Sequence, residues 1–170
     1  GLAVLLALIA MMVTLESTVL PFIFLASIGF AVIYNFGSNI FLGEISYITK
    51  AIAAVLQLGV TMDYSIFLYH RYEEERPNYD DNRDAMAQAV VAAFRSLSSS
   101  SLTTISGLVA LMLMQFKLGY DMGIVLVKGI LFSMISVFFL MPGLLMLFGK
   151  SIERTRHRNL VPHINLWGKV

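Results

Sequence analysis

The stretch of sequence that decides the fold is residues 51–69, AIAAVLQLGVTMDYSIFLY. It runs for 19 residues and carries a single formal charge, at Asp63. A helix needs about 20 mainly apolar residues to cross the hydrocarbon core of a bilayer, so this stretch predicts a membrane-spanning helix. An ionisable residue inside such a helix is costly, and Asp63 is therefore a candidate functional residue.

Four further apolar runs flank this stretch, at residues 1–15, 18–41, 97–116 and 122–148. Together the five runs predict an all-α integral membrane protein, a bundle of five transmembrane helices over residues 1–149. Residues 150–170 are expected to form a cytoplasmic tail or linker. The first run is too short to cross the bilayer and is expected to be the remainder of a cut span. The last run is longer than needed, and a tilt, an extension outside the membrane or a bend near Pro142 would absorb the excess.

The composition agrees with a membrane protein and excludes several other classes. Of the 170 residues, 58% are hydrophobic and 14% are charged, and the mean hydropathy is +0.77. Soluble domains have about 45–50% apolar residues and about 25% charged residues. A net charge of +1 gives no basic field for nucleic acid. The chain has no cysteine, and its histidines, at positions 70, 157 and 163, lack metal-ligand spacing. We expect neither an enzyme nor a cofactor.

The distribution of lysine and arginine predicts the orientation, because short loops rich in these residues stay in the cytoplasm. Two cations, Lys50 and Lys117, lie on one side of the five predicted spans. Nine lie on the other side: Arg71, Arg76, Arg83, Arg95, Lys150, Arg154, Arg156, Arg158 and Lys169. The C-terminus is therefore expected inside, and the loops at residues 43–50 and 117–121 are expected outside.

The largest predicted cytoplasmic loop contains an amphipathic segment at about residues 84–95. Met86, Val90 and Phe94 fall on one stripe of a helix, and Asp84, Gln88 and Arg95 fall on the opposite side. This pattern predicts an interfacial helix that lies on the inner membrane surface. The alternative is a solvated, charged connector.

Asp63 and Lys128 are the two formal charges inside the predicted spans. A charge near the middle of a membrane helix costs about 2.5–3.5 kcal/mol on insertion scales. Because desolvation favours the neutral form of a carboxyl group, Asp63 has the chemistry of a proton carrier. Tyr64 is adjacent and offers its hydroxyl group to a carboxylate on a partner helix, while Gly59, one turn earlier, leaves space beside Asp63. The alternative is an interhelical hydrogen bond without proton traffic.

Other polar residues in the spans are weaker candidates. Thr103 and Thr104 are expected at the depth of Asp63, about 10 Å from the inner end of their span, where they either solvate the acid or serve as small packing residues. Lys128 is expected nearer the outer face, and snorkelling to the boundary is favoured over a role in the proton relay. Gln57 and Thr61 share a stripe with Tyr64 and are expected to face other helices.

The motif around Asp63 resembles the MMPL branch of the resistance-nodulation-division (RND) superfamily of exporters. In that branch the fourth span carries Gly-x-x-x-Asp-Tyr, an apolar run and a cytoplasmic exit rich in Arg and Glu. Here the same pattern reads from Gly59 through Asp63 and Tyr64 to Arg71 and residues 73–75. The loop at residues 43–49 and the Ser/Thr-rich start of the fourth run are similar to that family as well.

The resemblance implies that the five runs are spans two to six of one half of such a transporter, and that Asp63 and Tyr64 belong to its proton relay. It also implies a proton-driven exporter of lipids or hydrophobic compounds, whose partners are the bilayer, a second half or second copy, and a porter domain. The block is also similar to sterol-sensing domains. The alternative function is therefore a lipid-sensing or scaffold module in which no ions flow.

Overall fold

The computed structural model describes residues 2–14, 17, 19–42 and 45–154. The main helices are α1 (Leu2–Thr14), α2 (Leu20–Ser38), α3 (Tyr47–Glu75), α4 (Asn82–Met112), α5 (Lys117–Ile135), α6 (Met141–Leu147) and α7 (Gly149–Arg154). Short turns of helix lie between them, η1 (Asn39–Leu42), η2 (Arg76–Asn78) and η3 (Ser136–Leu140). The described part of the chain is thus built from helices, as the apolar runs predicted. Most of the predicted tail at residues 150–170 lies outside the described residues.

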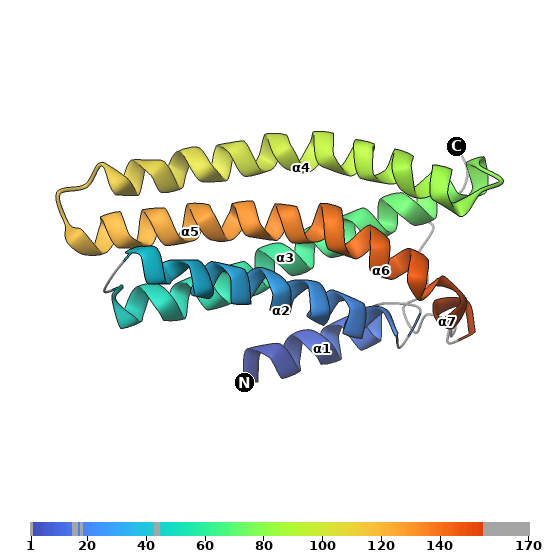
Figure 1. The fold of residues 1–170 in the computed structure, drawn as a ribbon, viewed down its shortest axis with the longest axis horizontal. Coiled ribbons are helices and arrows are strands. Elements are labelled where there is room, and N and C mark those ends of the chain that lie inside the picture. The colour runs from blue at the N-terminus through green and yellow to red at the C-terminus, as the bar shows by residue number, and fades with distance from the viewer. Residues whose placement is uncertain (1, 15–16, 18, 43–44, 155–170) are drawn as a thin grey trace, which may run out of the picture.

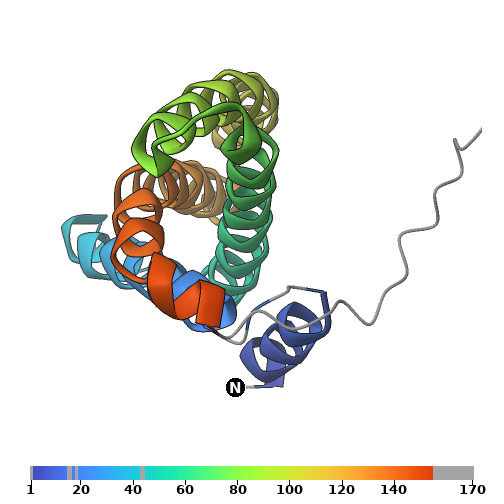
Figure 2. The same ribbon diagram turned by 90° about the vertical axis from the view of Figure 1, so that its right-hand side faces the viewer.

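Four helices, α2 to α5, lie side by side and alternate in direction, with α6 continuing the line of α5 (Figure 1). Viewed from the end, they surround a common interior, and α1 lies apart beside the start of α2 (Figure 2). Both α3 and α5 contact all the other members of the four-helix group. The candidate acid on α3 is therefore carried by one of the two most highly connected helices.

Three described helical stretches are long and apolar enough to cross a membrane: Leu20–Ser38, Tyr47–Asn78 and Lys117–Leu147. Neither the 13-residue α1 nor α4 is among them. The middle of α4 is rich in serine and threonine, and α4 has no stretch that is apolar enough to qualify. The structure shows a helical protein with three such helices, and the count of five spans remains a prediction.

The expected interfacial helix at residues 84–95 is not a separate element, because α4 continues without a break from Asn82 to Met112. Asp81 caps its start by accepting a hydrogen bond from the Arg83 backbone N–H at 3.0 Å. Met86, Ala89 and Ala93 are buried in the main core. No glycine or proline interrupts residues 84–97, so no residue there ends the helix. The small residues of this part of α4 allow it to pack closely against the bundle.

The predicted outer loop at residues 117–121 is also helical, because α5 begins at Lys117. At the other end of this long helix, the backbone widens into a π-helical turn, η3, which ends two residues before Pro142. The Met141 N–H bonds to the Ser136 carbonyl, five residues earlier. Proline lacks an N–H and its ring clashes with the carbonyl four residues before it, so the wider turn accommodates Pro142 near the position where a bend was expected.

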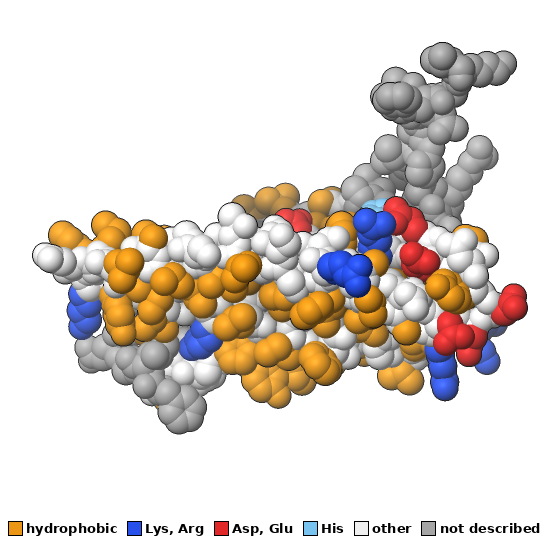
Figure 3. Space-filling model, turned by 90° about the horizontal axis from the view of Figure 1, so that it is seen from above, with side chains coloured by type: hydrophobic (Ala, Val, Ile, Leu, Met, Phe, Trp, Pro, Cys, Tyr) orange, Lys and Arg blue, Asp and Glu red, His pale blue; other side chains and the backbone are white. Residues whose placement is uncertain are grey.

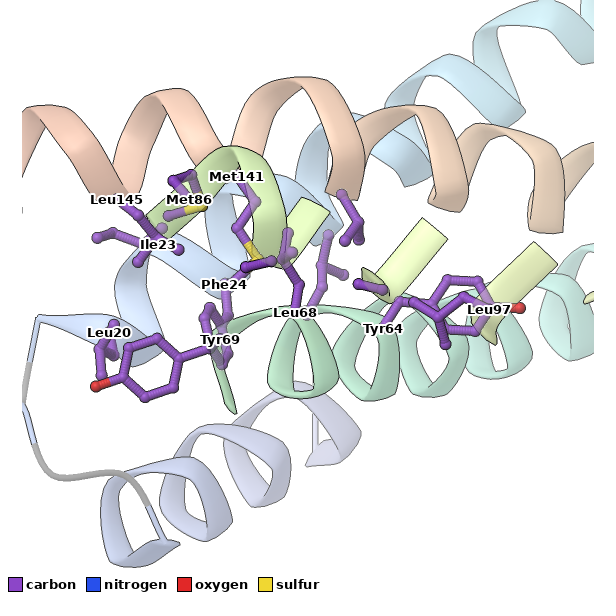
Figure 4. Close-up of a cluster of buried hydrophobic side chains, with 14 of the residues drawn as sticks. Leu20, Ile23, Phe24, Tyr64, Leu68, Tyr69, Met86, Leu97, Met141 and Leu145 are labelled. Carbon is purple, nitrogen blue, oxygen red and sulfur yellow. The ribbon is translucent and has the colours of Figure 1, made fainter. Parts of the chain in front are cut away.

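The largest apolar core gathers side chains from α2, α3, α4 and α6, with Met11 of α1 and Val137 of η3 (Figure 4). Phe24 and Leu68 are fully buried there, and Tyr69 meets Phe24 edge to face, with ring centroids 6.2 Å apart. On the face seen in Figure 3, most charged side chains lie in the half that ends at the α3–α4 connection, a few lie near mid-length or toward the other end, and apolar and uncharged polar side chains cover most of the remaining surface. This distribution agrees with a helical bundle in a bilayer.

Candidate functional site

The candidate site centres on two adjacent residues of α3 that face in different directions. The side chain of Asp63 is exposed on a side of α3 that the other described helices leave uncovered. Along the same side, Val55 is 63% exposed, and a Cβ atom built on Gly59 would meet nothing within 4 Å. Among the described residues, no hydrogen bond or ion pair reaches the Asp63 carboxylate. The carboxylate thus lies on an open surface with space beside it.

Tyr64 points into the bundle, because successive residues of an α-helix are rotated by about 100°. Its side chain is only 9% exposed and joins the main core, where Figure 4 shows it beside Leu97 of α4. The Tyr64 hydroxyl is hydrogen-bonded to the Ser101 hydroxyl of α4 at 2.5 Å. Its partner in this structure is therefore a serine of the same bundle, where the sequence suggested a carboxylate of a partner helix.

Thr103 and Thr104 lie on the exposed side of α4. Their hydroxyl groups donate to the carbonyls of Ser99 and Ser100, at 3.3 and 3.2 Å. Such bonds within a helix satisfy the hydroxyl hydrogen and leave the oxygen lone pairs free to accept. No hydrogen bond in the described structure joins either threonine to Asp63. Both residues share with Asp63 the property of lying on surface that this bundle does not cover.

Lys128, the second charge in the predicted spans, is half-buried on α5. Its ammonium group donates to the side-chain oxygen of Asn39 in η1, at 2.5 Å. Asn39 directly follows α2, at the opposite end of the bundle from the α3–α4 connection. Lys128 is therefore held by an amide side chain, away from Asp63.

The interior also contains polar residues that were not predicted from the sequence, namely Asn35, Ser133 and Ser136. Gln57 accepts a hydrogen bond from Asn35 at 2.9 Å, and Thr61 donates to Ser133 at 2.7 Å. Gln57 and Thr61 face other helices, as predicted. The available signal for the others was a single polar residue within an apolar run, since such residues must find partners inside the protein.

The comparisons with known proteins identify the family. The model of the MMPL family matches residues 1–170, the whole chain. The chain belongs to the MMPL family. The resemblance of the motif around Asp63 and Tyr64 to the MMPL family is thus confirmed by the match over the whole chain.

This MMPL chain is similar to several membrane proteins. It is 30% identical over 145 residues to the membrane protein ActII-3 of Streptomyces coelicolor, covering 82% of this chain and 20% of that protein. It is 36% identical over 92 residues to the membrane protein MJ1562 of Methanocaldococcus jannaschii, covering 54% of this chain and 24% of that protein. It is 23% identical over 127 residues to the trehalose monomycolate exporter MmpL3 of Mycobacterium tuberculosis, covering 74% of this chain and 14% of that protein. No solved structure matches the chain.

The MMPL chain therefore spans about a fifth of the length of these relatives. Within its described residues, no group of three or more His, Cys, Asp or Glu side chains is placed to hold a metal ion. What its site offers chemically is a carboxyl group on an uncovered helix face, next to a tyrosine whose hydroxyl is already bonded inside the bundle.

Proposed function

We propose that this MMPL chain is the transmembrane energy-coupling part of an exporter that uses the proton motive force to move lipids or other hydrophobic compounds. Membership of the MMPL family supports this proposal. So does similarity to a protein named as an exporter of trehalose monomycolate. The relatives are several times longer, and the proposed partners are accordingly a second transmembrane half or second copy and a porter domain.

The observation that carries the proposal is the exposure of Asp63 on a candidate membrane span whose interior face is hydrogen-bonded to the neighbouring helices through Gln57, Thr61 and Tyr64. An ionised carboxylate facing lipid costs about 2.5–3.5 kcal/mol, so Asp63 is stable there when it is protonated or covered by another polar surface. A group that alternates between these two conditions takes up and releases a proton. In this proposal Asp63 is the carrier.

The neighbouring residues have supporting roles. Tyr64 and Ser101 form a hydroxyl pair between α3 and α4, in the interior of the bundle, and Gly59 leaves room beside the acid for a partner helix or for water. Thr103 and Thr104 offer acceptor oxygens to whatever covers the open surface. Lys128, bonded to Asn39, is assigned to holding α5 against the end of α2 and not to the relay.

The proposed orientation places the α3–α4 connection and the residues after α6 in the cytoplasm. The α3–α4 connection lies at the same end of the bundle as α7 (Figure 1), and this end carries most of the cations of the described chain. Lysine and arginine are retained on the cytoplasmic side. The connections between α2 and α3 and between α4 and α5 are then extracytoplasmic.

The test is proton flux through the full-length protein in phospholipid vesicles that contain a pH-sensitive dye, after a pH gradient is imposed. Asp63→Asn keeps the size and hydrogen-bonding capacity of the side chain but removes its titration. We expect this change to reduce the flux at least tenfold toward that of empty vesicles. Asp80→Asn, the same change at an exposed residue between α3 and α4, is the control and should leave it unchanged. Wild-type flux in Asp63→Asn, or no flux in the wild type, would contradict the proposal.

A second candidate function, lipid sensing without ion flux, is favoured by one specific feature. A groove of about 420 Å³ lies between α2 and the α5–η3 segment. Its walls carry the aromatic side chains of Phe30, Tyr34, Phe132 and Phe139. A sensor of this kind would bind an apolar ligand in the groove and would show no proton flux dependent on Asp63, so the same vesicle experiment separates the two functions.

A further inference from the structure

Gln57 joins three helices of the bundle through one side chain. Its amide nitrogen donates to the Ala31 carbonyl of α2 at 2.8 Å and to the Gly129 carbonyl of α5 at 3.4 Å. Its amide oxygen accepts from the Asn35 side chain of α2 at 2.9 Å. The Gln57 side chain is only 2% exposed. Both ends of the amide are therefore occupied, and α3 is tied at one point to α2 and α5 together.

Two further features strengthen this connection. A Cβ atom on Gly129 would lie 3.0 Å from the Asn35 side-chain nitrogen and 3.8 Å from the Gln57 amide, so the glycine allows both amides to come close to α5. One turn after Gln57, Thr61 donates to Ser133 at 2.7 Å, and Ser133 donates to the Gly129 carbonyl at 2.9 Å. The face of α3 that carries Gln57 is thus attached to α5 at two successive turns.

Fixing this face also fixes the direction of Asp63. Asp63 is the sixth residue after Gln57, and at about 100° per residue the two side chains point about 120° apart around α3. When Gln57 is bonded toward α2 and α5, Asp63 must face away from them. A rotation of α3 that turned Asp63 toward the interior would require all three amide contacts of Gln57 to break.

We propose that Gln57 is a positioning residue, which holds α3 at the rotation that keeps Asp63 on the uncovered face. It acts on Asp63 through the helix and touches no reacting atom. The importance of this for transport rests on the proposed function, whereas the effect on the rotation of α3 does not.

Loss of the Gln57 hydrogen bonds should change the rotation of α3 about its own axis. Gln57→Leu replaces the amide with an apolar side chain of similar size, so it removes all three contacts and leaves the Asn35 amide without its partner. With side chains reaching about 5–6 Å from the helix axis, a rotation of 40° would move a surface side chain by about 4 Å.

The experiment measures this rotation directly in the full-length protein in lipid, with any cysteines outside this chain replaced. His70 is exposed and lies seven residues after Asp63, on nearly the same face of α3, and Phe22 of α2 is 58% exposed. Spin labels on His70→Cys and Phe22→Cys report the distance between the two helices by pulsed EPR. We expect Gln57→Leu to shift or broaden this distance distribution relative to the wild type, by about 4 Å if α3 turns by about 40°.

The matched control is Ser136→Ala. Ser136 donates to the Ser27 carbonyl at 2.7 Å, so this change also removes a buried bond between helices, but one that does not involve α3. It should leave the label distance unchanged. Gln57→Asn, which keeps the amide but is too short to reach both helices, is the second variant and should shift the distance if Gln57→Leu does not fold. An unchanged distance in the folded Gln57 variants, or an equal shift in Ser136→Ala, would overturn the proposal.

Proton flux separates this proposal from the proposed function. If Asp63 carries protons, Gln57→Leu should change the pH at which flux is half-maximal, after correction for the amount of folded protein. A loss of stability alone lowers the maximum without moving that pH. If the label moves but Asp63→Asn retains full flux, the positioning role stands and the transport role of Asp63 is wrong. If the label does not move, the positioning role is wrong whatever the flux.

Discussion

The contact between α4 and α5 leads to a quantitative prediction about Gly123. This residue is buried on α5, where a Cβ atom would collide with the Met112 side chain and would lie 2.9 Å from the Leu108 carbonyl oxygen and 3.2 Å from the Met112 backbone nitrogen. Two of these three atoms belong to the backbone of α4, which cannot move as a side chain can. Gly123→Ala should therefore push the two helices apart.

The expected size of the effect follows from two opposing contributions. Overpacking of this kind costs about 1–3 kcal/mol, and a backbone collision places Gly123→Ala in the upper half of that range. Replacing a helical glycine by alanine returns about 0.8–1 kcal/mol. The net loss of stability is about 1–2 kcal/mol. Gly29 of α2, where a Cβ atom would meet nothing within 4 Å, is the matched control, and Gly29→Ala should gain about 0.8–1 kcal/mol.

The assay is thermal unfolding of the purified full-length protein in detergent, with each variant compared with the wild type. At about 2–4 °C per kcal/mol for a domain of this size, the melting temperatures of the two variants should differ by about 4–12 °C, with Gly123→Ala below the wild type and Gly29→Ala above it. If Gly123→Ala were stabilised as much as Gly29→Ala, α4 and α5 would not be in contact at this position, and the arrangement of α4 described above would be wrong.

Two further predictions concern topology and Tyr64. Cysteines introduced as Ser46→Cys and Asn78→Cys should react with a membrane-impermeant maleimide from opposite sides of the membrane, because they lie at opposite ends of α3; labelling from one side would refute α3 as a span. Tyr64→Phe removes the bond to Ser101 and should lower stability by about 1–3 kcal/mol, because it leaves a buried hydroxyl without its partner. It should also reduce proton flux less than Asp63→Asn does, and an equal or greater reduction would make Tyr64 part of the carrier itself.

Much of the helical architecture could be predicted, because long apolar runs between polar segments leave few alternatives to helices in a membrane. The run at residues 18–41 corresponds to α2, and the run at residues 51–69 lies within α3, which extends beyond it at both ends, from Tyr47 to Glu75. The separation of residues 84–95 from the fourth apolar run was predicted from a change in composition, and the structure shows one continuous helix there. A helix ends at a residue that breaks it or at a capping residue, and α4 continues without such an end as far as Met112.

The residues of the candidate site were easier to find than their partners. Asp63 was identifiable because a charge in an apolar run is expensive, and the 100° rotation between neighbours predicted that Tyr64 would face elsewhere. Which of the two would face the interior depends on contacts between α3 and α4 that are distant in sequence. For the same reason Ser101 could not be selected as the partner of Tyr64 from a run that contains four consecutive serines.

The two faces of α3 suggest how protonation of Asp63 would be transmitted. The interior bonds of Gln57, Thr61 and Tyr64 are complete without Asp63, so a change in its charge alters none of them. The energetic effect of that charge must then appear where Asp63 is exposed, at the contact with whatever surface covers it. On the proposed function, this bundle would respond to the proton as one body, and the movement would occur between it and its partner.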